Sequence, residues 1–272
     1  VYSAEVSTAA LNAGIQRAPT MLQKAATMTV SVTNNVATVH VYNETGHKLP
    51  SGYPEGRRMW IHLRALDGSG TLIQQFGAYD PNTAVLDAAT TKVYEIKPGI
   101  SAALSTVVGL PTGPSFHFVL NNQVYSDNRI PPRGFTNVNF ASIQSPPVAY
   151  SYADGQFWDE TQYTLSSVPA KVVATLYYQT LSKEYVEFLR DENRTNNWGQ
   201  TLYNLWAANG KSTPVAMATA TYRPSDTQAP SAPAGLTATA VSASQINLQW
   251  TASTDNVAVA GYSIFRNGVA VG

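Results

Sequence analysis

The sequence predicts a mainly β protein: an antiparallel β-sandwich with an N-terminal helix and a two-helix insert, then a linker and a partial second β-sandwich. Runs in which apolar and polar residues alternate recur from Met28 onward, separated by turns rich in Pro and Gly. Helical spacing is confined to the first 26 residues and to a stretch at about 182–209. A Pro-, Ala- and Ser-rich stretch at 224–234 separates two unequal parts.

These observations divide the chain into four parts. Residues 1–26 are predicted to form a helical connector, 27–223 the β-sandwich domain with its helical insert, 224–234 the linker, and 235–272 the partial β-sandwich. In the connector an apolar stripe runs along the expected helix. Pro19 is expected to kink or split this helix.

The predicted sandwich begins with a hairpin that turns at Asn34 and Asn35. In the second strand Ala37, Val39 and Val41 share one face, and in the third strand Met59, Ile61, Leu63 and Ala65 do the same, with Trp60, His62 and Arg64 facing outward. Further strands are expected at 71–76, 93–98, 101–110, 115–121, 135–141, 169–181 and 215–224. Ser182 is the expected N-cap of the first inserted helix, and Gly210 the stop of the second.

Composition limits the function classes. The 272 residues carry 17 basic and 17 acidic side chains, so no positive excess directs the protein to nucleic acid. The absence of Cys excludes disulfides, zinc–thiolate sites, Cys nucleophiles and covalent haem attachment through a CxxCH motif within this chain. No apolar run approaches the roughly 18 residues of a membrane-spanning helix.

Motifs for catalysis are also missing. The sequence contains no GxSxG, HExxH or Gly-rich phosphate loop. The adjacent acids Asp159–Glu160 and Asp191–Glu192 are interpreted as solvated charge rather than as a glycosidase pair. We therefore predict a non-enzymatic protein with no catalytic or metal-binding residues.

His47 is the candidate site residue. It lies in the loop between Asn43 and Trp60, which is rich in Pro and Gly, whereas His40, His62 and His117 alternate with apolar residues and are expected at hydrogen-bonded surface positions. Two interpretations stay open for His47: a preorganised ligand carrier, or an imidazole bonded to the loop backbone.

A second loop, 125–135, again combines Arg, Pro and Gly. Its arginines and those of the first loop are expected to pair with nearby acids and so to hold the loops in place. The arginines are Arg57, Arg58, Arg129 and Arg133, and the expected acids are Glu55, Glu95 and Asp127.

The C-terminal part resembles a fibronectin type III domain. The residues that carry the resemblance are Pro230, Pro233, Leu236, Trp250, Asp255–Asn256, Gly261–Tyr262 and Phe265. Because such domains have about 100 residues, 235–272 corresponds to roughly half of one.

Residues 5–222 resemble the C-terminal, haem-free β-domain of secreted multihaem c-type cytochromes. Three blocks carry the resemblance: NETGHKLPSGYPEGRRMW, VYSDNRIPPRGF and YYQTLSKEYVEFLRDEN. It implies an extracellular or cell-surface accessory domain that serves electron transfer by docking on a multihaem cytochrome module, located upstream or on a separate chain. It also implies that His47 is an axial ligand in trans to haem c of that neighbouring module. No haem would be bound covalently by this chain itself.

A different class of function remains open beside this one. The 15 Tyr and 5 Trp residues, together with the unpaired edges of half a fibronectin-like domain, also fit a surface adhesin, a glycan-binding module or a filament-forming structural protein that associates with its own copies. Neither alternative has a nucleic acid partner or a membrane span.

Overall fold

The computed structural model describes residues 7–255, 257 and 259–271. The first six residues of the predicted connector, Asn256 of the fibronectin-like motif, Ala258 and Gly272 lie outside the described residues.

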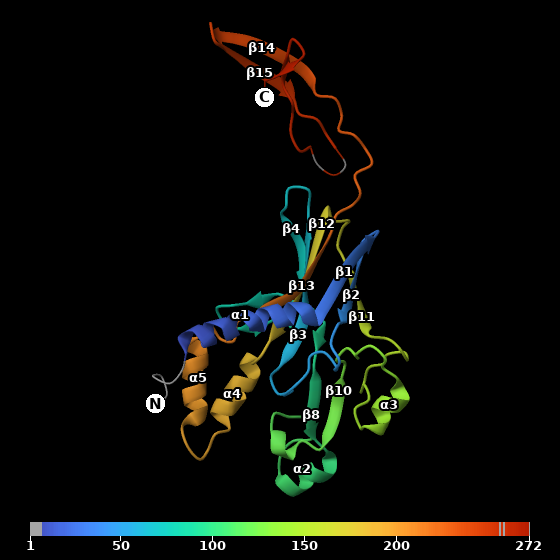
Figure 1. Ribbon diagram of the computed structural model, residues 1–272, viewed down its shortest axis with the longest axis vertical. Helices are drawn as coiled ribbons and strands as arrows, with labels where there is room; N and C mark the ends of the chain where they lie inside the picture. Colours follow the sequence, from blue (N-terminus) through green and yellow to red (C-terminus); the bar gives the residue numbers. More distant parts are fainter. Residues whose placement is uncertain (1–6, 256, 258, 272) are drawn as a thin grey trace.

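Two antiparallel sheets form the sandwich (Figure 1). The first has the order β1-β2-β11, and the second has the order β13-β12-β3-β4, with β7 paired to the remaining part of β3. The strands of the first sheet are β1 (Ala26–Thr33), β2 (Val36–Asn43) and β11 (Trp158–Thr164). Those of the second are β3 (Arg58–Leu66), β4 (Leu72–Phe76), β7 (Val93–Tyr94), β12 (Lys171–Gln179) and β13 (Val215–Tyr222). The predicted β-sandwich is thereby confirmed.

The core lies between these sheets and follows the predicted alternation. One buried cluster contains the inward residues of β2 and those of β3 and β12, all of them without solvent exposure. They are Ala37, Val39 and Val41 of β2, Met59, Ile61, Leu63 and Ala65 of β3, and Val172, Ala174 and Leu176 of β12. Trp60 corrects the expectation for the outward face of β3, because Tyr79 and Tyr177 cover its ring and leave it fully buried.

The N-terminal helix α1 (Thr8–Ala25) is continuous, so of the kink or split predicted at Pro19 the split is wrong. Proline removes the hydrogen bond to the carbonyl of the residue four positions earlier, here Ile15, and Ile15 is exposed to water that can replace that bond. Only the end of the helix packs on the sandwich core, through Leu22 and Ala25.

Three predicted strands are helical instead. Residues 101–110 form α2 (Ala102–Val108), 115–121 contain the short 3₁₀ helix η1 (Phe118–Leu120), and 135–141 contain α3 (Asn137–Ser142). Ser101 and Thr136 cap α2 and α3 by accepting hydrogen bonds from backbone N–H groups three residues on. Local capping therefore outweighs the β propensity of the Val, Phe and Thr residues in these stretches.

The helices α2 and α3 flank a smaller sheet at the end of the molecule that is remote from the C-terminus (Figure 1). This sheet has the order β10-β8-β9. Its strands are β8 (Ile96–Ile100), β9 (Gly113–Pro114) and β10 (Gln123–Asp127), and a separate pair is formed by β5 (Tyr79–Asp80) and β6 (Val85–Leu86).

The two-helix insert is confirmed as α4 (Lys183–Asp191) and α5 (Trp198–Ala208). The Ser182 hydroxyl accepts a hydrogen bond from the Tyr185 amide at 3.3 Å, as expected of an N-cap. Gly199 allows the helices to approach closely, because a Cβ there would lie 2.2 Å from the Leu189 carbonyl oxygen.

The C-terminal part is a hairpin of β14 (Ala234–Ser242) and β15 (Gln245–Thr251), followed by the two-residue strands β16 (Phe265–Arg266) and β17 (Val269–Ala270). The linker separates the hairpin from the sandwich (Figure 1). Trp250 contacts Tyr262 edge to face, with 5.1 Å between ring centroids, and the Tyr262 hydroxyl accepts from the Ser253 amide. Both residues belong to the fibronectin-like motif.

Candidate functional site

The structure brings the two loops selected in the sequence into direct contact. Leu49 and Ile130 form an isolated antiparallel bridge, in which each amide donates to the other's carbonyl at 2.9 and 3.0 Å. The first loop follows β2 and leads into β3, whereas the second follows β10. The sandwich and the smaller sheet thus each contribute one side of the site.

Asn43 is the hydrogen-bonding centre of this contact. Its side chain is fully buried, and its amide nitrogen donates to the His47 carbonyl at 2.7 Å and to the Ile130 carbonyl at 2.9 Å. Its side-chain oxygen accepts from both the amide and the hydroxyl of Thr45. Because one side chain fixes both loops, the backbone at His47 has a defined position.

A buried ionic group lies next to it. Lys48 donates to Asp127 at 2.7 Å, and Arg129 binds the two oxygens of the same carboxylate at 2.8 and 2.9 Å. Burial raises the pKa of Asp127, but the hydrogen bonds from Arg129 and Lys48 outweigh it and keep that pKa below its ordinary value. Two cations against one carboxylate leave one positive charge in excess.

The His47 side chain is exposed. Within the described part of the chain its imidazole makes no hydrogen bond and no ion pair, so the structure favours a free imidazole over one bonded to the loop backbone. It lines a hollow of about 590 Å³. The other lining residues are Gly46, Lys48, Ser51, Gly52, Arg129, Phe140, Ile143 and Ser145.

Phe140 and Ile143 were missed in the sequence, because 135–141 was predicted to be a strand and Ile143 was assigned to no element. The structure places Phe140 in α3 and Ile143 at its C-cap, with 67% of the Ile143 side chain exposed beside the His47 loop. Thr136, a residue type favoured at N-caps, was the available signal for this helix.

These residues fit one axial position of a haem and no covalent attachment. A neutral imidazole is an axial ligand of haem iron, apolar side chains match the face of the macrocycle, and cations match its propionate groups. His47, the Phe140–Ile143 pair and Arg129 supply these three features on one hollow.

The predicted Arg pairings hold only in part. Arg129 pairs with Asp127 as expected, but Arg58 pairs with Glu184 at 3.4 Å, and Arg133 with Glu44 at 2.7 Å. Arg57 donates to the Ser51 carbonyl at 2.6 Å. Among the described residues, neither Glu55 nor Glu95 forms an ion pair with an arginine. Glu95 pairs with Lys97 instead. The sequence could not predict the ion pairs of Arg58 and Arg133, because each acid lies far from its arginine along the chain.

The other three histidines are hydrogen-bonded, as predicted. His40 contacts Glu160 at 2.7 Å, and His62 contacts Gln75 at 3.1 Å. His117 contacts the Ser115 hydroxyl at 2.8 Å. Each of these imidazoles therefore has a protein partner, which distinguishes them from His47.

Asp159 corrects the interpretation of the paired acids. It is 2% exposed and accepts from Tyr94 and Tyr150, while Lys92 lies 3.2 Å away. Its neighbour Glu160 points outward, because successive residues of a strand face opposite sides. The Thr161 hydroxyl also donates to it at 3.3 Å, so Asp159 is a buried structural carboxylate with four partners.

Two other features are absent from the described residues. They contain no group of three or more His, Cys, Asp or Glu side chains arranged for a metal ion. None of their helices is long and apolar enough to cross a membrane.

No family model matches the chain. Short sections are similar to parts of much longer enzymes. An alpha-amylase of Niallia circulans is 35% identical over 142 residues, which cover 44% of this chain and 11% of the amylase. Chitinase Chi52 of Paenibacillus xylanexedens is 56% identical over 46 residues, covering 17% of this chain and 9% of that enzyme. Chitinase A1 of Niallia circulans is 50% identical over 68 residues, covering 25% and 9% respectively.

The chain therefore spans about a tenth of the length of these curated relatives. These shared sections support the resemblance to a fibronectin type III domain that accompanies a secreted enzyme. They do not support the resemblance to a domain of multihaem cytochromes. Among solved structures, the crystal structure of a penta-haem cytochrome c552 from Thermochromatium tepidum aligns with a TM-score of 0.44 and 18% identity, over 75% of this chain and 41% of that one. Similarity at this level does not establish a shared fold.

Proposed function

We propose that the chain is a non-catalytic accessory part of an extracellular or cell-surface multihaem c-type cytochrome. It docks on the haem module and supplies His47 as the sixth ligand of one haem. The observation that carries the proposal is the exposed imidazole, without a partner among the described residues, on a loop whose backbone is fixed by buried hydrogen bonds.

Preorganisation is the physical reason for this choice. An axial ligand from another module binds more tightly when its loop loses little conformational freedom on docking. Asn43 and the Leu49–Ile130 bridge hold the loop before any partner arrives. The rest of the docking face would consist of Phe140 and Ile143 against the macrocycle, with Arg129 near the propionates.

The short sections shared with chitinases and an amylase support the accessory role and the extracellular location in this proposal. They do not bear on electron transfer, which rests on the resemblance of the three sequence blocks and on the setting of His47. In the proposed complex, bound haem would supply the iron that carries the electron. This chain would supply one ligand to that iron and would exclude water from one face of the haem.

The chain can be tested directly with a haem c peptide whose iron keeps one His ligand and an open sixth position. Addition of the wild-type chain should convert the absorption spectrum from high-spin to low-spin. His47→Ala should abolish the conversion. His40→Gln is the matched control, because it removes another imidazole that is already bonded to Glu160.

Two outcomes would overturn the proposal: a high-spin spectrum with the wild-type chain at saturation, or an unchanged conversion with His47→Ala. Arg129→Gln gives a second readout, since it should weaken binding and reduce its dependence on salt concentration.

A further inference from the structure

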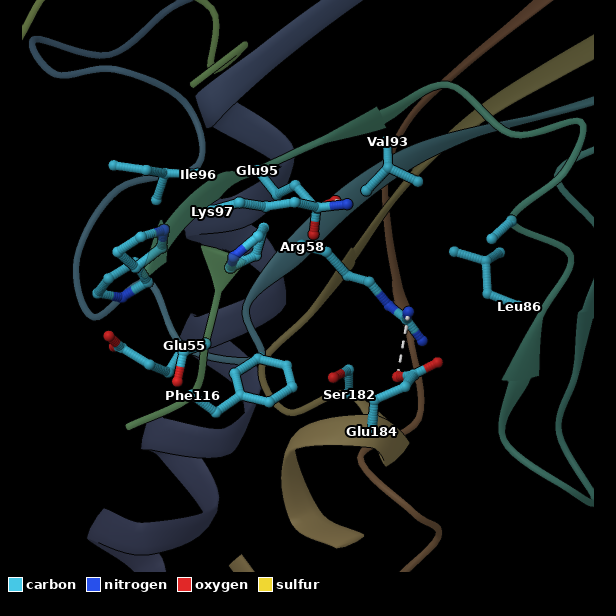
Figure 2. A pocket seen from close by; sticks show the side chains of 16 residues that line it. Glu55, Arg58, Leu86, Val93, Glu95, Ile96, Lys97, Phe116, Ser182 and Glu184 are labelled. Carbon is cyan, nitrogen blue, oxygen red and sulfur yellow. Dashed lines mark ion pairs between the residues drawn. The ribbon is translucent and has the colours of Figure 1, made fainter. Parts of the chain in front are cut away.

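A second hollow, of about 410 Å³, lies on the far part of the same first loop and shares no lining residue with the His47 hollow (Figure 2). Its volume is near the lower end of the range of about 300–1,000 Å³ typical of small-molecule sites. The lining includes the ionisable residues Glu55, Arg58, Glu95, Lys97 and Glu184, the hydroxyl residues Ser115 and Ser182, and the aromatic Phe116.

Two side chains of this lining carry buried polar atoms without a partner among the described residues. They are Nη2 of Arg58 and Oε2 of Glu55, on residues that are only 8% and 3% exposed. The other groups of Arg58 are engaged: its Nε donates to Gln179 at 3.0 Å, and its Nη1 lies 3.4 Å from Glu184. A buried donor or acceptor without a hydrogen bond destabilises the protein unless a ligand or a water molecule binds it.

Further hydrogen-bonding groups surround these atoms. The dashed contact in Figure 2 joins Arg58 to Glu184, and Ser182 lies at the same end of the hollow. The Ser182 oxygen accepts from the Tyr185 amide, and its hydroxyl hydrogen has no acceptor among the described residues. The hollow thus offers both donors and carboxylate acceptors to one ligand.

The charges of the hollow balance closely. Lys97 pairs with Glu95 at 3.0 Å, and Arg58 pairs with Glu184, which leaves Glu55 as the remaining ionisable side chain. Burial raises the pKa of Glu55 and so favours its neutral form. No positive excess remains to recognise an anion, and the hollow fits a neutral ligand.

An aromatic ring forms part of the wall. Phe116 packs on Tyr185 and Phe188 of α4, with ring centroids 5.2 and 5.6 Å apart, and this contact fixes the orientation of its ring. Pro54, Pro98 and Pro114 add rigid apolar surface. A pyranose sugar has the complementary form, because its C–H face is apolar and each of its hydroxyl groups both donates and accepts hydrogen bonds.

We propose that this hollow binds one neutral pyranose unit, with its C–H face toward Phe116 and its hydroxyl groups toward Arg58, Ser182 and Glu184. The site is independent of the proposed haem contact, because none of its residues belongs to the His47 hollow.

Ligand-observed NMR of the full chain tests this with three neutral probes, methyl glucoside, methyl galactoside and N-acetylglucosamine, and with two charged ones, glucuronate and glucosamine. At least one neutral sugar should bind, and in a protein-observed spectrum of the ¹⁵N-labelled chain it should shift the Arg58 side-chain NεH resonance. Failure of all three neutral sugars, or tighter binding of glucuronate, would overturn the proposal.

A matched pair of variants locates the binding. Phe116→Ala should raise the Kd by about tenfold, through loss of the apolar wall. Phe118→Ala should leave it within about twofold, because this exposed ring packs on Tyr53 and does not line the hollow. Equal effects of the two variants would contradict the assignment.

If Phe116→Ala does not fold, Glu184→Gln provides the same test. Its side chain is 53% exposed, so the substitution perturbs packing little. We expect a Kd raised by about fivefold, since a carboxylate forms stronger hydrogen bonds to hydroxyl groups than an amide does. An unchanged Kd would place the sugar elsewhere and refute the site.

Discussion

The strands β3 and β14 have the same length and comparable alternation, yet their surroundings differ completely. Of the nine residues of β3, Met59, Ile61, Leu63 and Ala65 have no solvent exposure, whereas all nine residues of β14 are exposed. Both strands have antiparallel partners. Backbone pairing alone therefore does not bury a strand: burial requires a second layer, and that layer supplies most of the stability.

The largest expected difference between the two regions is in apolar contacts. Leu63→Ala should lower the free energy of unfolding of the sandwich by about 3–4 kcal/mol, because it opens a cavity in the core. Leu236→Ala, at a position in β14 that is 68% exposed, should change it by less than about 0.5 kcal/mol. Chemical denaturation followed by far-UV circular dichroism and tryptophan fluorescence measures both, and similar losses would contradict the comparison.

Buried charge should come next. Asp127→Asn leaves Lys48 and Arg129 without their shared carboxylate and should cost about 3 kcal/mol. Asp226→Asn, in the exposed linker, is the control and should have an effect below about 0.5 kcal/mol. Thermal unfolding at neutral pH compares the two, and an Asp127→Asn protein as stable as the control would refute the role of this ionic group.

The same carboxylate predicts a pH dependence. The folded pKa of Asp127 is lowered by Arg129 and Lys48, so its contribution is present above the unfolded value of about 3.9 and is lost as the pH falls through the folded value. Wild-type stability should therefore fall more steeply in this acid range than that of Asp127→Asn. Parallel curves would mean that Asp127 is not held ionised by its partners.

A smaller effect is expected for the uncharged hydrogen-bonding centre. Asn43→Ala removes one donor from each of the carbonyls of His47 and Ile130 and leaves the Thr45 amide without its acceptor, so it should cost about 2 kcal/mol. Asn247→Ala, in the exposed β15, should stay within about 0.5 kcal/mol. Hydrogen exchange at the Thr45 amide gives a local measure, and unchanged protection there would show that Asn43 does not fix the loop.

Alternation and capping predicted much of the sandwich. The faces of β2 and β3, the turn at Asn34 and the N-cap Ser182 follow from residues adjacent in the sequence. The errors arose where distant residues decide, as at Trp60, or where a local cap outweighs the strand propensity, as in α3. Trp60 is buried by Tyr79 and Tyr177, which no local pattern reveals, and α3 forms where Thr136 caps a segment whose composition favours a strand.

The candidate site was predicted to a similar extent. His47 stood out because its loop combines Gly, Pro and charge, and the structure adds that its side chain is exposed and has no partner within the part of the chain that is described. Lys48 could not be recognised as the partner of Asp127, because the two residues are 79 positions apart in the sequence. Asp127 ends β10, and the fold brings that end of the strand to the loop of Lys48. The hollow beside His47 could not be predicted either, because its lining residues come from segments that are distant in the sequence.

Near-infrared magnetic circular dichroism of the haem c peptide, saturated with this chain, tests the role of His47 most directly, because its charge-transfer band identifies the two axial ligands. The account predicts the band of bis-imidazole ligation with the wild-type chain and with His40→Gln, and its absence with His47→Ala. A bis-imidazole band that persists in His47→Ala, or no such band with the wild-type chain, would contradict the proposed role of His47.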